Sequence, residues 1–184
     1  STAPSGRELL YLAHNHIPTM WDKRDITLAH GEWQPIRGGH ESRRVFPNGV
    51  ELQTRVWPGT AGVKMEMRLT NNSKNKLTGL YTQNCAMLGN MMGFNQQTID
   101  NKVFTPMAVA CGDPSGTRWI LYAWQACVRG WGSELCPCLH SDPHFPDIAV
   151  GKSAVLRGWM AFYEGTEIDE ALENVNRMPW LRVE

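Results

Sequence analysis

The sequence predicts an all-β protein, an antiparallel β-sandwich with long loops and a short C-terminal helix. Three observations predict this class. Apolar and polar residues alternate with a period of two over several stretches, turn signals rich in Gly, Pro and Asn separate those stretches, and a helix-like pattern is found after residue 165. The 184 residues have the length of one domain, and the 42% that are hydrophobic suffice for a sizeable core. We therefore expect residues 1–184 to form a single β-sandwich domain.

The first half of the chain predicts three strands. Apolar residues alternate with mostly polar ones from residue 50 to residue 57, and the alternation resumes after a turn over residues 58–62 and continues to residue 70. This pattern is typical of a hairpin with one apolar and one charged face. The turn Pro47-Asn48-Gly49 precedes the hairpin, so we expect another strand over residues 43–46.

The second half of the chain predicts four more strands and one helix. After a polar turn over residues 71–76, we expect strands over residues 77–88, 103–111, 117–128 and 154–163, with residues 112–116 (GDPSG) as the turn of a hairpin. Thr166 followed by Asp169 resembles a capping box, which predicts a short helix within residues 166–176. Pro179 should stop any further helix.

Three segments do not alternate and predict long loops: residues 1–42, an extended N-terminal segment, and residues 89–102 and 132–153. All six histidines lie in the first and last of these, namely His14, His16, His30, His40, His140 and His144. Long loops in a compact domain are usually functional or need a partner, so we look for chemistry there.

Charge and composition exclude several partners. The 18 basic residues balance the 18 acidic ones, whereas nucleic acids and anionic membranes select a basic surface. The longest uncharged stretch, residues 77–99, contains six Asn and Gln residues, which a bilayer core does not accept cheaply. We expect a soluble protein without nucleic-acid or membrane partners. The first six residues hold no signal peptide, and a secreted or periplasmic location, with such a peptide already removed, stays open, as does a homo-oligomer.

The five cysteines do not predict a disulfide framework, because their number is odd and a domain of this size does not need one. Cys136-Pro-Cys138 lacks the CxxC spacing of zinc and redox sites. Cys85 and Cys127 fall in apolar strands, where a thiol is more often inert packing than a nucleophile. The chain also lacks GxSxG, GxGxxG, P-loop and HExxH motifs.

The densest group of reactive side chains lies in the segment from Cys136 to Asp147, which contains three prolines. Its candidate catalytic residues are His140, Asp142, His144 and Asp147. A carboxylate beside a histidine fixes the tautomer of the imidazole and raises its basicity, which suits a general base or a metal ligand. The alternative is that these residues cap turns and face solvent.

A second group points to metal binding. His14 and His16 form an H-x-H pair, and on a strand both imidazoles would face the same side. His40 is a candidate third ligand, so the cofactor implied is a divalent transition metal. The alternative is that these are surface or core histidines, and the pair lacks the downstream Glu, Gly and His pattern of a cupin.

Strand parity predicts a ligand-binding face of aromatic, amide and guanidinium groups. Three sets of residues each share one face of a predicted strand. They are Gln125, Cys127, Arg129 and Trp131 in the first set, Arg157 and Trp159 in the second, and Tyr81 and Gln83 in the third. If these faces lie side by side, aromatic rings can cover the C–H side of a sugar while the polar groups bond its hydroxyls. The alternative is that most of the eight Trp residues anchor the core.

Residues 67–80 (MRLTNNSKNKLTGL) resemble β-sandwich domains of the galactose-mutarotase-like group, in which a strand ending in Leu-Thr-Asn leads through a polar turn to the next strand. Residues 130–147 and 157–165 also look like segments of bacterial proteins of this build. The resemblance covers roughly residues 43–165. It implies a supersandwich fold and a carbohydrate-related role, with a ligand on the concave sheet face.

Three functions follow as hypotheses. The first is a carbohydrate-active protein that binds a saccharide and acts on it by His/Asp acid–base chemistry of the lyase, epimerase or hydrolase type. The second is a metal-dependent enzyme with a His-rich site. The third is a non-catalytic carbohydrate-binding module.

Overall fold

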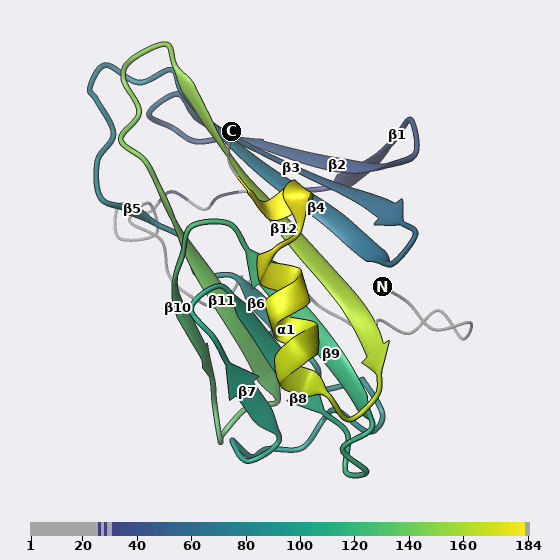
Figure 1. Cartoon of the computed structure of the whole chain (residues 1–184). Coiled ribbons are helices and arrows are strands. Elements are labelled where there is room, and N and C mark those ends of the chain that lie inside the picture. Colours follow the sequence, from purple (N-terminus) through teal and green to yellow (C-terminus); the bar gives the residue numbers. More distant parts are fainter. Residues whose placement is uncertain (1–25, 27, 29–30, 183–184) are drawn as a thin grey trace.

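The computed structural model describes residues 26, 28 and 31–182, which form two antiparallel sheets packed against each other (Figure 1). The larger sheet is built from Trp33–Ile36 (β1), Gly39–Val45 (β2), Val50–Gly59 (β3), Gly62–Asn71 (β4), Lys102–Phe104 (β7), Ala108–Gly112 (β8), Arg118–Trp124 (β9) and Ser153–Glu164 (β12). The smaller sheet is built from Leu80–Tyr81 (β5), Cys85–Met87 (β6), Cys127–Gly132 (β10) and Cys138–Phe145 (β11).

Strand order shows how the chain connects these layers. The larger sheet runs β1-β2-β3-β4-β12-β9-β8-β7, so the last strand of the chain lies in its middle. In the smaller sheet β11 is central, because it pairs with β10 on one side and with β5 and β6 on the other. The predicted all-β, sandwich-like class is confirmed. The part of the chain that the structure describes has one α-helix, Ile168–Asn176 (α1), and one 3₁₀ helix, Pro179–Leu181 (η2).

The hairpin predicted from the alternating pattern is formed by β3 and β4. Its register ends with Gly59 opposite Gly62, which leaves a two-residue turn. Gly62 has a φ of +148°, and a Cβ at this position would lie 2.4 Å from the carbonyl oxygen of Met160 on β12. Only glycine therefore lets the hairpin approach β12 so closely.

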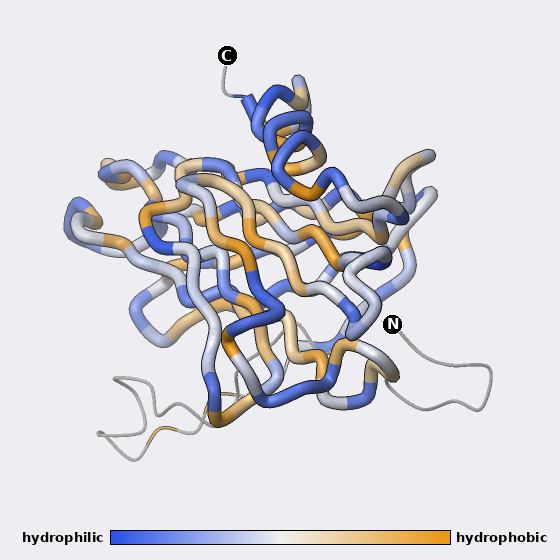
Figure 2. Tube along the Cα trace, turned by 60° about the horizontal axis from the view of Figure 1, so that its bottom comes forward, coloured by the Kyte–Doolittle hydropathy of each residue, from blue (hydrophilic) through white to orange (hydrophobic). Residues whose placement is uncertain are grey.

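The main hydrophobic core lies between the two sheets. Alternate residues of the larger sheet supply one side of it, including Met65, Met67, Ile120, Tyr122, Trp124, Leu156 and Met160. Strands β6 and β11 of the smaller sheet and the segment that follows β6 supply the other side, including Ala86, Leu88, Met91, Phe94, Leu139 and Phe145. Hydrophobic stretches along the central strands are visible in Figure 2. Removal of this apolar surface from water is the main term that holds the two sheets together.

A second, smaller core lies on the opposite face of the larger sheet, under α1 (Figure 1). Small side chains of the sheet, Ala108, Ala110, Ala123 and Ala161, let the helix approach closely, and Leu172 and Val175 of α1 are buried against them. The predicted helix is confirmed, but the predicted capping box is wrong. Glu167 is the N-cap, no side chain caps the helix, and the Thr166 hydroxyl bonds to the Glu167 carboxylate instead.

The structure differs from the expected strands in four ways. The predicted strand over residues 77–88 is interrupted and forms only β5 and β6, and the predicted strand over residues 117–128 ends at Trp124. The single strand predicted over residues 103–111 is instead a hairpin, because β7 and β8 pair antiparallel with each other. Residues 33–42, expected to belong to a long N-terminal loop, form β1 and the start of β2. Ala126, with a φ of +54°, makes the turn into β10. Pro179 starts η2 and does not simply end the helical region.

The largest difference concerns residues 132–153, which were expected to form a loop. They contain β11, the central strand of the smaller sheet. Alternation is hidden here because both faces of the strand are covered: Leu139 and Phe145 face the core, and His140, Ser141 and Asp142 are nearly as buried. Buried polar groups can be tolerated when they are hydrogen-bonded. In β11 the Ser141 hydroxyl accepts the backbone N–H of Trp124, and Asp142 accepts the Trp131 indole N–H and the backbone N–H of Asn84.

No helix in the described residues is long and apolar enough to cross a bilayer.

Candidate functional site

Strand β11 brings the predicted catalytic residues onto one face of the smaller sheet. Because side chains alternate along a strand, Cys138, His140, Asp142 and His144 point away from the main core. The neighbouring strands place further side chains beside them, since Cys85 of β6 is opposite His140, and Tyr81 of β5 is opposite His144. We call this the outer face of the smaller sheet.

A β-bulge in β10 completes the outer face. Cys127 is opposite Pro143, but the register then shifts, so that Arg129 is opposite Asp142 and Val128 is the extra residue. Pro143 has no amide hydrogen to offer a neighbour, which is why a proline inside a sheet is found at such irregular positions. Trp131 consequently lies opposite His140. Cys127 does not share their face, contrary to the parity expected from the sequence, because the bulge interrupts the alternation.

Asp142 is the centre of the hydrogen-bond network on this face. Its Oδ2 accepts bonds from the Trp131 indole N–H at 2.7 Å and from the Arg129 guanidinium at 3.1 and 3.2 Å. Its Oδ1 accepts the backbone N–H of Asn84 at 2.9 Å and lies 3.7 Å from Nδ1 of His140, an ion-pair distance. Burial alone would raise the pKa of this carboxyl, but its interactions with His140, Trp131, Asn84 and Arg129 outweigh burial, and the pKa lies below its ordinary value.

His140 lies under the indole of Trp131. The two rings are stacked with their centroids 3.8 Å apart and their planes 18° apart, and His140 is only 1% exposed. The Arg129 guanidinium lies on the indole, 4.6 Å from its centroid. A layer of Arg129, Trp131 and His140 therefore closes this part of the outer face.

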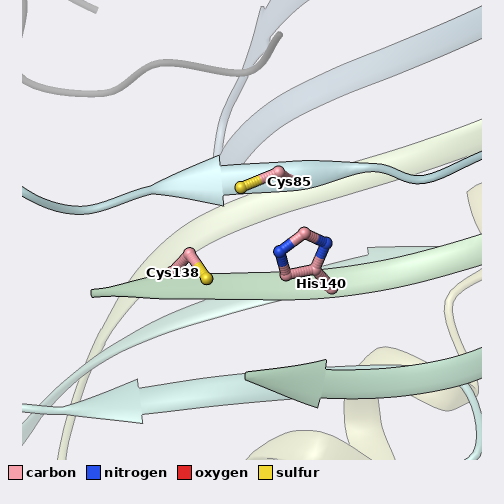
Figure 3. Close-up of side chains that lie close together, drawn as sticks. All are labelled: Cys85, Cys138 and His140. Carbon is pink, nitrogen blue, oxygen red and sulfur yellow. The ribbon is translucent and has the colours of Figure 1, made fainter. Parts of the chain in front are cut away.

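Two thiols lie beside His140 (Figure 3). The Sγ atoms of Cys85 and Cys138 and one nitrogen of His140 all lie within 4.8 Å of one another, and all three residues are buried. The thiol of Cys136 is nearby and hydrogen-bonds to the Sδ of Met87 at 3.4 Å. All five cysteines are free thiols.

The charges of this cluster depend on one another. A hydrogen bond from Cys85, together with His140 and Cys136, outweighs burial and lowers the pKa of Cys138 to about 4. The hydrogen bond between Cys85 and Cys138 raises the pKa of Cys85, and burial raises it further. Burial lowers the pKa of His140, but the interactions with Asp142 and Cys138 outweigh burial, so the pKa of His140 lies above its ordinary value. The arrangement favours a Cys138 thiolate beside an imidazolium, which is chemically suited to metal binding, nucleophilic attack or thiol oxidation.

An open pocket of about 550 Å³ lies next to this cluster on the outer face. It is lined by Tyr81, Thr82, Gln83, Val128, Arg129 and Asp142. Four of these six, Tyr81, Gln83, Arg129 and Asp142, are candidate ligand-binding or catalytic residues of the sequence analysis. Tyr81 is 73% exposed, and its ring is supported by His144, with the two ring centroids 4.6 Å apart.

The remaining candidates for the ligand-binding face lie elsewhere. Trp159 is sealed in the smaller core under α1, and Arg157 lies on the ring of Trp180, 4.9 Å from its centroid. Both are on the helix side of the larger sheet, so the predicted faces do not adjoin. Gln125 is buried after the end of β9, where its side-chain oxygen accepts the Arg157 amide. The expectation of one continuous face is wrong because these strands belong to different sheets.

Two other predictions concern isolated residues. Asp147 follows β11, is half-exposed and pairs with Lys76 at 2.8 Å, away from the network around Asp142. His40 is exposed on β2 and, within residues 26, 28 and 31–182, does not belong to the group suited to metal binding. His14 and His16 lie outside the described residues.

Sequence reasoning missed the pairing of Cys85 with Cys138 and His140. Cys85 was interpreted as inert packing, and Cys136-Pro-Cys138 was set aside because its spacing is not CxxC. The available signal was the local pattern Cys138-Leu-His140, which on a strand turns the thiol and the imidazole to the same face.

No protein-family model matches the chain, and no curated protein matches it. The resemblance to the galactose-mutarotase-like group therefore stays a prediction.

Proposed function

We propose that the protein binds a saccharide in the pocket on the outer face of the smaller sheet. One observation carries the proposal: an exposed aromatic ring, an amide, a guanidinium and a carboxylate converge on one open pocket from separate parts of the chain. Binding sites for small ligands combine apolar walls with a few oriented polar groups, and this pocket has that composition.

The apolar part of the pocket supports stacking against a sugar ring. Tyr81 exposes most of its side chain, and Val128, displaced by the bulge, is 58% exposed. An exposed aromatic ring gains free energy when a ligand covers it, and the flat C–H side of a pyranose fits such a ring. His144 behind Tyr81 limits the motion of the ring, so less conformational freedom is lost on binding.

The polar part of the pocket supports recognition of hydroxyl groups. Gln83 is exposed and carries both an amide donor and a carbonyl acceptor. Arg129 is held in place by Asp142 and Trp131, yet its side chain is 60% exposed and presents further N–H groups to the pocket. Fixed donors and acceptors of this kind give specificity without a large net charge, in agreement with a neutral ligand.

The surroundings of the candidate catalytic residues favour binding over turnover. His140 is covered by Trp131, and Asp142 already accepts several hydrogen bonds that lower its pKa and make it a weak base. Asp147 pairs with Lys76 outside the pocket. We therefore infer a carbohydrate-binding protein, and the acid–base chemistry considered from the sequence is less well supported.

The experiment is a titration of the full chain with galactose, glucose, xylose, lactose and cellobiose, followed by NMR and calorimetry. We expect at least one sugar to bind and to shift resonances of Tyr81, Val128 and Arg129. Tyr81→Ala should weaken that binding roughly tenfold or more, which corresponds to about 1.4 kcal/mol. Phe162→Ala is the matched control, because Phe162 is a similarly exposed aromatic residue on β12 of the larger sheet.

Two results would contradict the proposal. One is the absence of binding by every sugar of the panel at millimolar concentration. The other is binding that survives Tyr81→Ala and Arg129→Ala unchanged, because the ligand would then occupy a different surface.

A further inference from the structure

The cluster of Cys85, Cys138 and His140 has the geometry of an incomplete metal site. Its three potential ligand atoms lie within 4.8 Å of one another. Bond lengths of about 2.3 Å to sulfur and about 2.0 Å to nitrogen place the ligands of a tetrahedral zinc ion roughly 3.5–3.8 Å apart, so a small inward movement of the side chains is enough.

Two paired strands hold these ligands. Cys85 of β6 is opposite His140 of β11, and Cys138 precedes His140 by two positions on the same face. Backbone hydrogen bonds between the strands therefore set the spacing before any ion binds. Figure 3 shows one imidazole nitrogen turned toward the two sulfur atoms. Because Nδ1 is the nitrogen near Asp142, the one facing the thiols is Nε2.

The contact between Asp142 and His140 is typical of the surroundings of a metal-bound histidine. A metal-ligating imidazole usually presents its second nitrogen to a carboxylate, which orients the ring and strengthens it as a ligand. Asp142 occupies that position and is itself held by Arg129, Trp131 and Asn84. The ring is further fixed by its stack against Trp131.

Additional sulfur donors surround the cluster. Cys136 interacts with Cys138, and its Sγ lies 3.4 Å from the Sδ of Met87, the residue opposite Cys138. Thiolates and thioethers prefer soft or borderline ions such as Cu⁺ and Zn²⁺ over Mg²⁺ or Ca²⁺. Cys111 shows the contrast, since its side chain belongs to the main core and contacts Asn101 and the Phe94 carbonyl.

We propose that Cys85, Cys138 and His140 bind one thiophilic closed-shell metal ion, Zn²⁺ or Cu⁺. None of the three ligands lines the saccharide pocket, although Asp142 borders both sites, and the proposal does not depend on the proposed function. The ion links β6 to β11 across the outer face and stabilises the folded chain, because the unfolded chain does not hold the ligands together.

The test uses the full chain, reduced, stripped of metal and kept free of oxygen. Co²⁺ serves as a spectroscopic probe for Zn²⁺, and Cu⁺ is added in parallel against a chromophoric Cu⁺ chelator, which distinguishes the two ions. We expect one equivalent to bind, with thiolate-to-cobalt charge-transfer absorption that Zn²⁺ abolishes. Cys85→Ser and Cys138→Ser should each lose this band, whereas Cys127→Ser, on β10, should keep it.

A second measurement guards against variants that fail to fold. The wild-type protein should unfold at a higher temperature with Zn²⁺ or Cu⁺ than without it, and Cys127→Ser should show the same increase. The proposal is overturned if the reduced, folded wild-type protein takes up less than roughly a tenth of an equivalent of either ion. It is also overturned if folded Cys85→Ser and Cys138→Ser proteins bind as tightly as the wild type.

Discussion

The indole of Trp131 is stacked on the imidazole of His140, with centroids 3.8 Å apart, and the N–H of the same indole donates to Asp142 at 2.7 Å. One side chain thus covers the histidine and bonds its neighbouring carboxylate. The residue joins the two parts of the outer face, the pocket and the thiol–imidazole cluster. Its two roles can be separated by substitution.

Trp131→Phe should retain an aromatic ring over His140 but lose the donor to Asp142. A hydrogen bond to a charged group is worth about 1.5–3 kcal/mol when buried, and Trp131 is half-buried, so we expect a loss of about 1–2 kcal/mol in the free energy of unfolding. Trp131→Ala also removes the ring and should cost about 2–4 kcal/mol. Urea denaturation measures both losses.

Trp33→Ala is the control for this pair, because Trp33 is an exposed tryptophan on β1 of the larger sheet. We expect it to cost less than about 1 kcal/mol. Equal losses for Trp33→Ala and Trp131→Ala would show that the stack contributes nothing specific.

Gly130→Ala should disturb the outer face from the opposite side of β10. Gly130 lies between Arg129 and Trp131, and a Cβ there would be 2.8 Å from Cγ1 of Val109 and 3.3 Å from the Thr105 carbonyl oxygen. Val109 is fully buried in the main core and has little room to move. Overpacking of this kind costs about 1–3 kcal/mol, so β10 should shift away from the core.

The shift of β10 is measurable in two ways: a lower urea midpoint and a change in Trp131 fluorescence or in its NMR resonances. Gly89→Ala is the matched control, because the contact of its Cβ is at 3.9 Å, an ordinary distance. If Gly130→Ala is as stable as Gly89→Ala, the packing of β10 on the core is looser than described.

The turn between β8 and β9 should make the protein sensitive to acid through Asp113. Hydrogen bonds from Ser115 first and then from Arg118 outweigh burial and lower the pKa of Asp113 from 3.8 to about 2. Since the pKa is lower in the folded than in the unfolded chain, the stabilisation is fully present above about pH 4. It is lost as the pH falls toward 2, where the folded carboxyl becomes protonated.

We therefore expect the stability difference between wild type and Asp113→Asn to shrink as the pH is lowered from 5 to 2, in roughly the window that the two pKa values set. Thermal unfolding at a series of pH values measures it. A difference that stays constant over this range would mean that the Asp113 carboxylate does not contribute through its charge.

Local patterns predicted the parts of the fold in which one face of a strand is buried and the other is wet. The β3–β4 hairpin and the turn over residues 112–116 between β8 and β9 agree with the patterns in the sequence. Strand β12 was also predicted, although cores on both sides of the larger sheet cover its two faces. The short helix was also predicted, although the capping box from which it was inferred does not form. Within the site, the sequence singled out Tyr81, Gln83, Arg129, Trp131, His140 and Asp142 by their chemistry.

Tertiary structure alone decided which of those residues meet. The alternation of strand β11 is hidden because some of its polar side chains are buried, and hydrogen bonds from distant parts of the chain stabilise them there. One example is the bond from the backbone N–H of Asn84 to the carboxylate of Asp142, 58 positions away. Three other features depend on strand pairing in the same way: the bulge at Val128, the position of Cys85 opposite His140, and the location of Arg157 and Trp159 on the far side of the larger sheet. Side-chain alternation is a property of adjacent residues, whereas strand order is set by packing of the whole chain, so residue types were readable from the sequence and their neighbours were not.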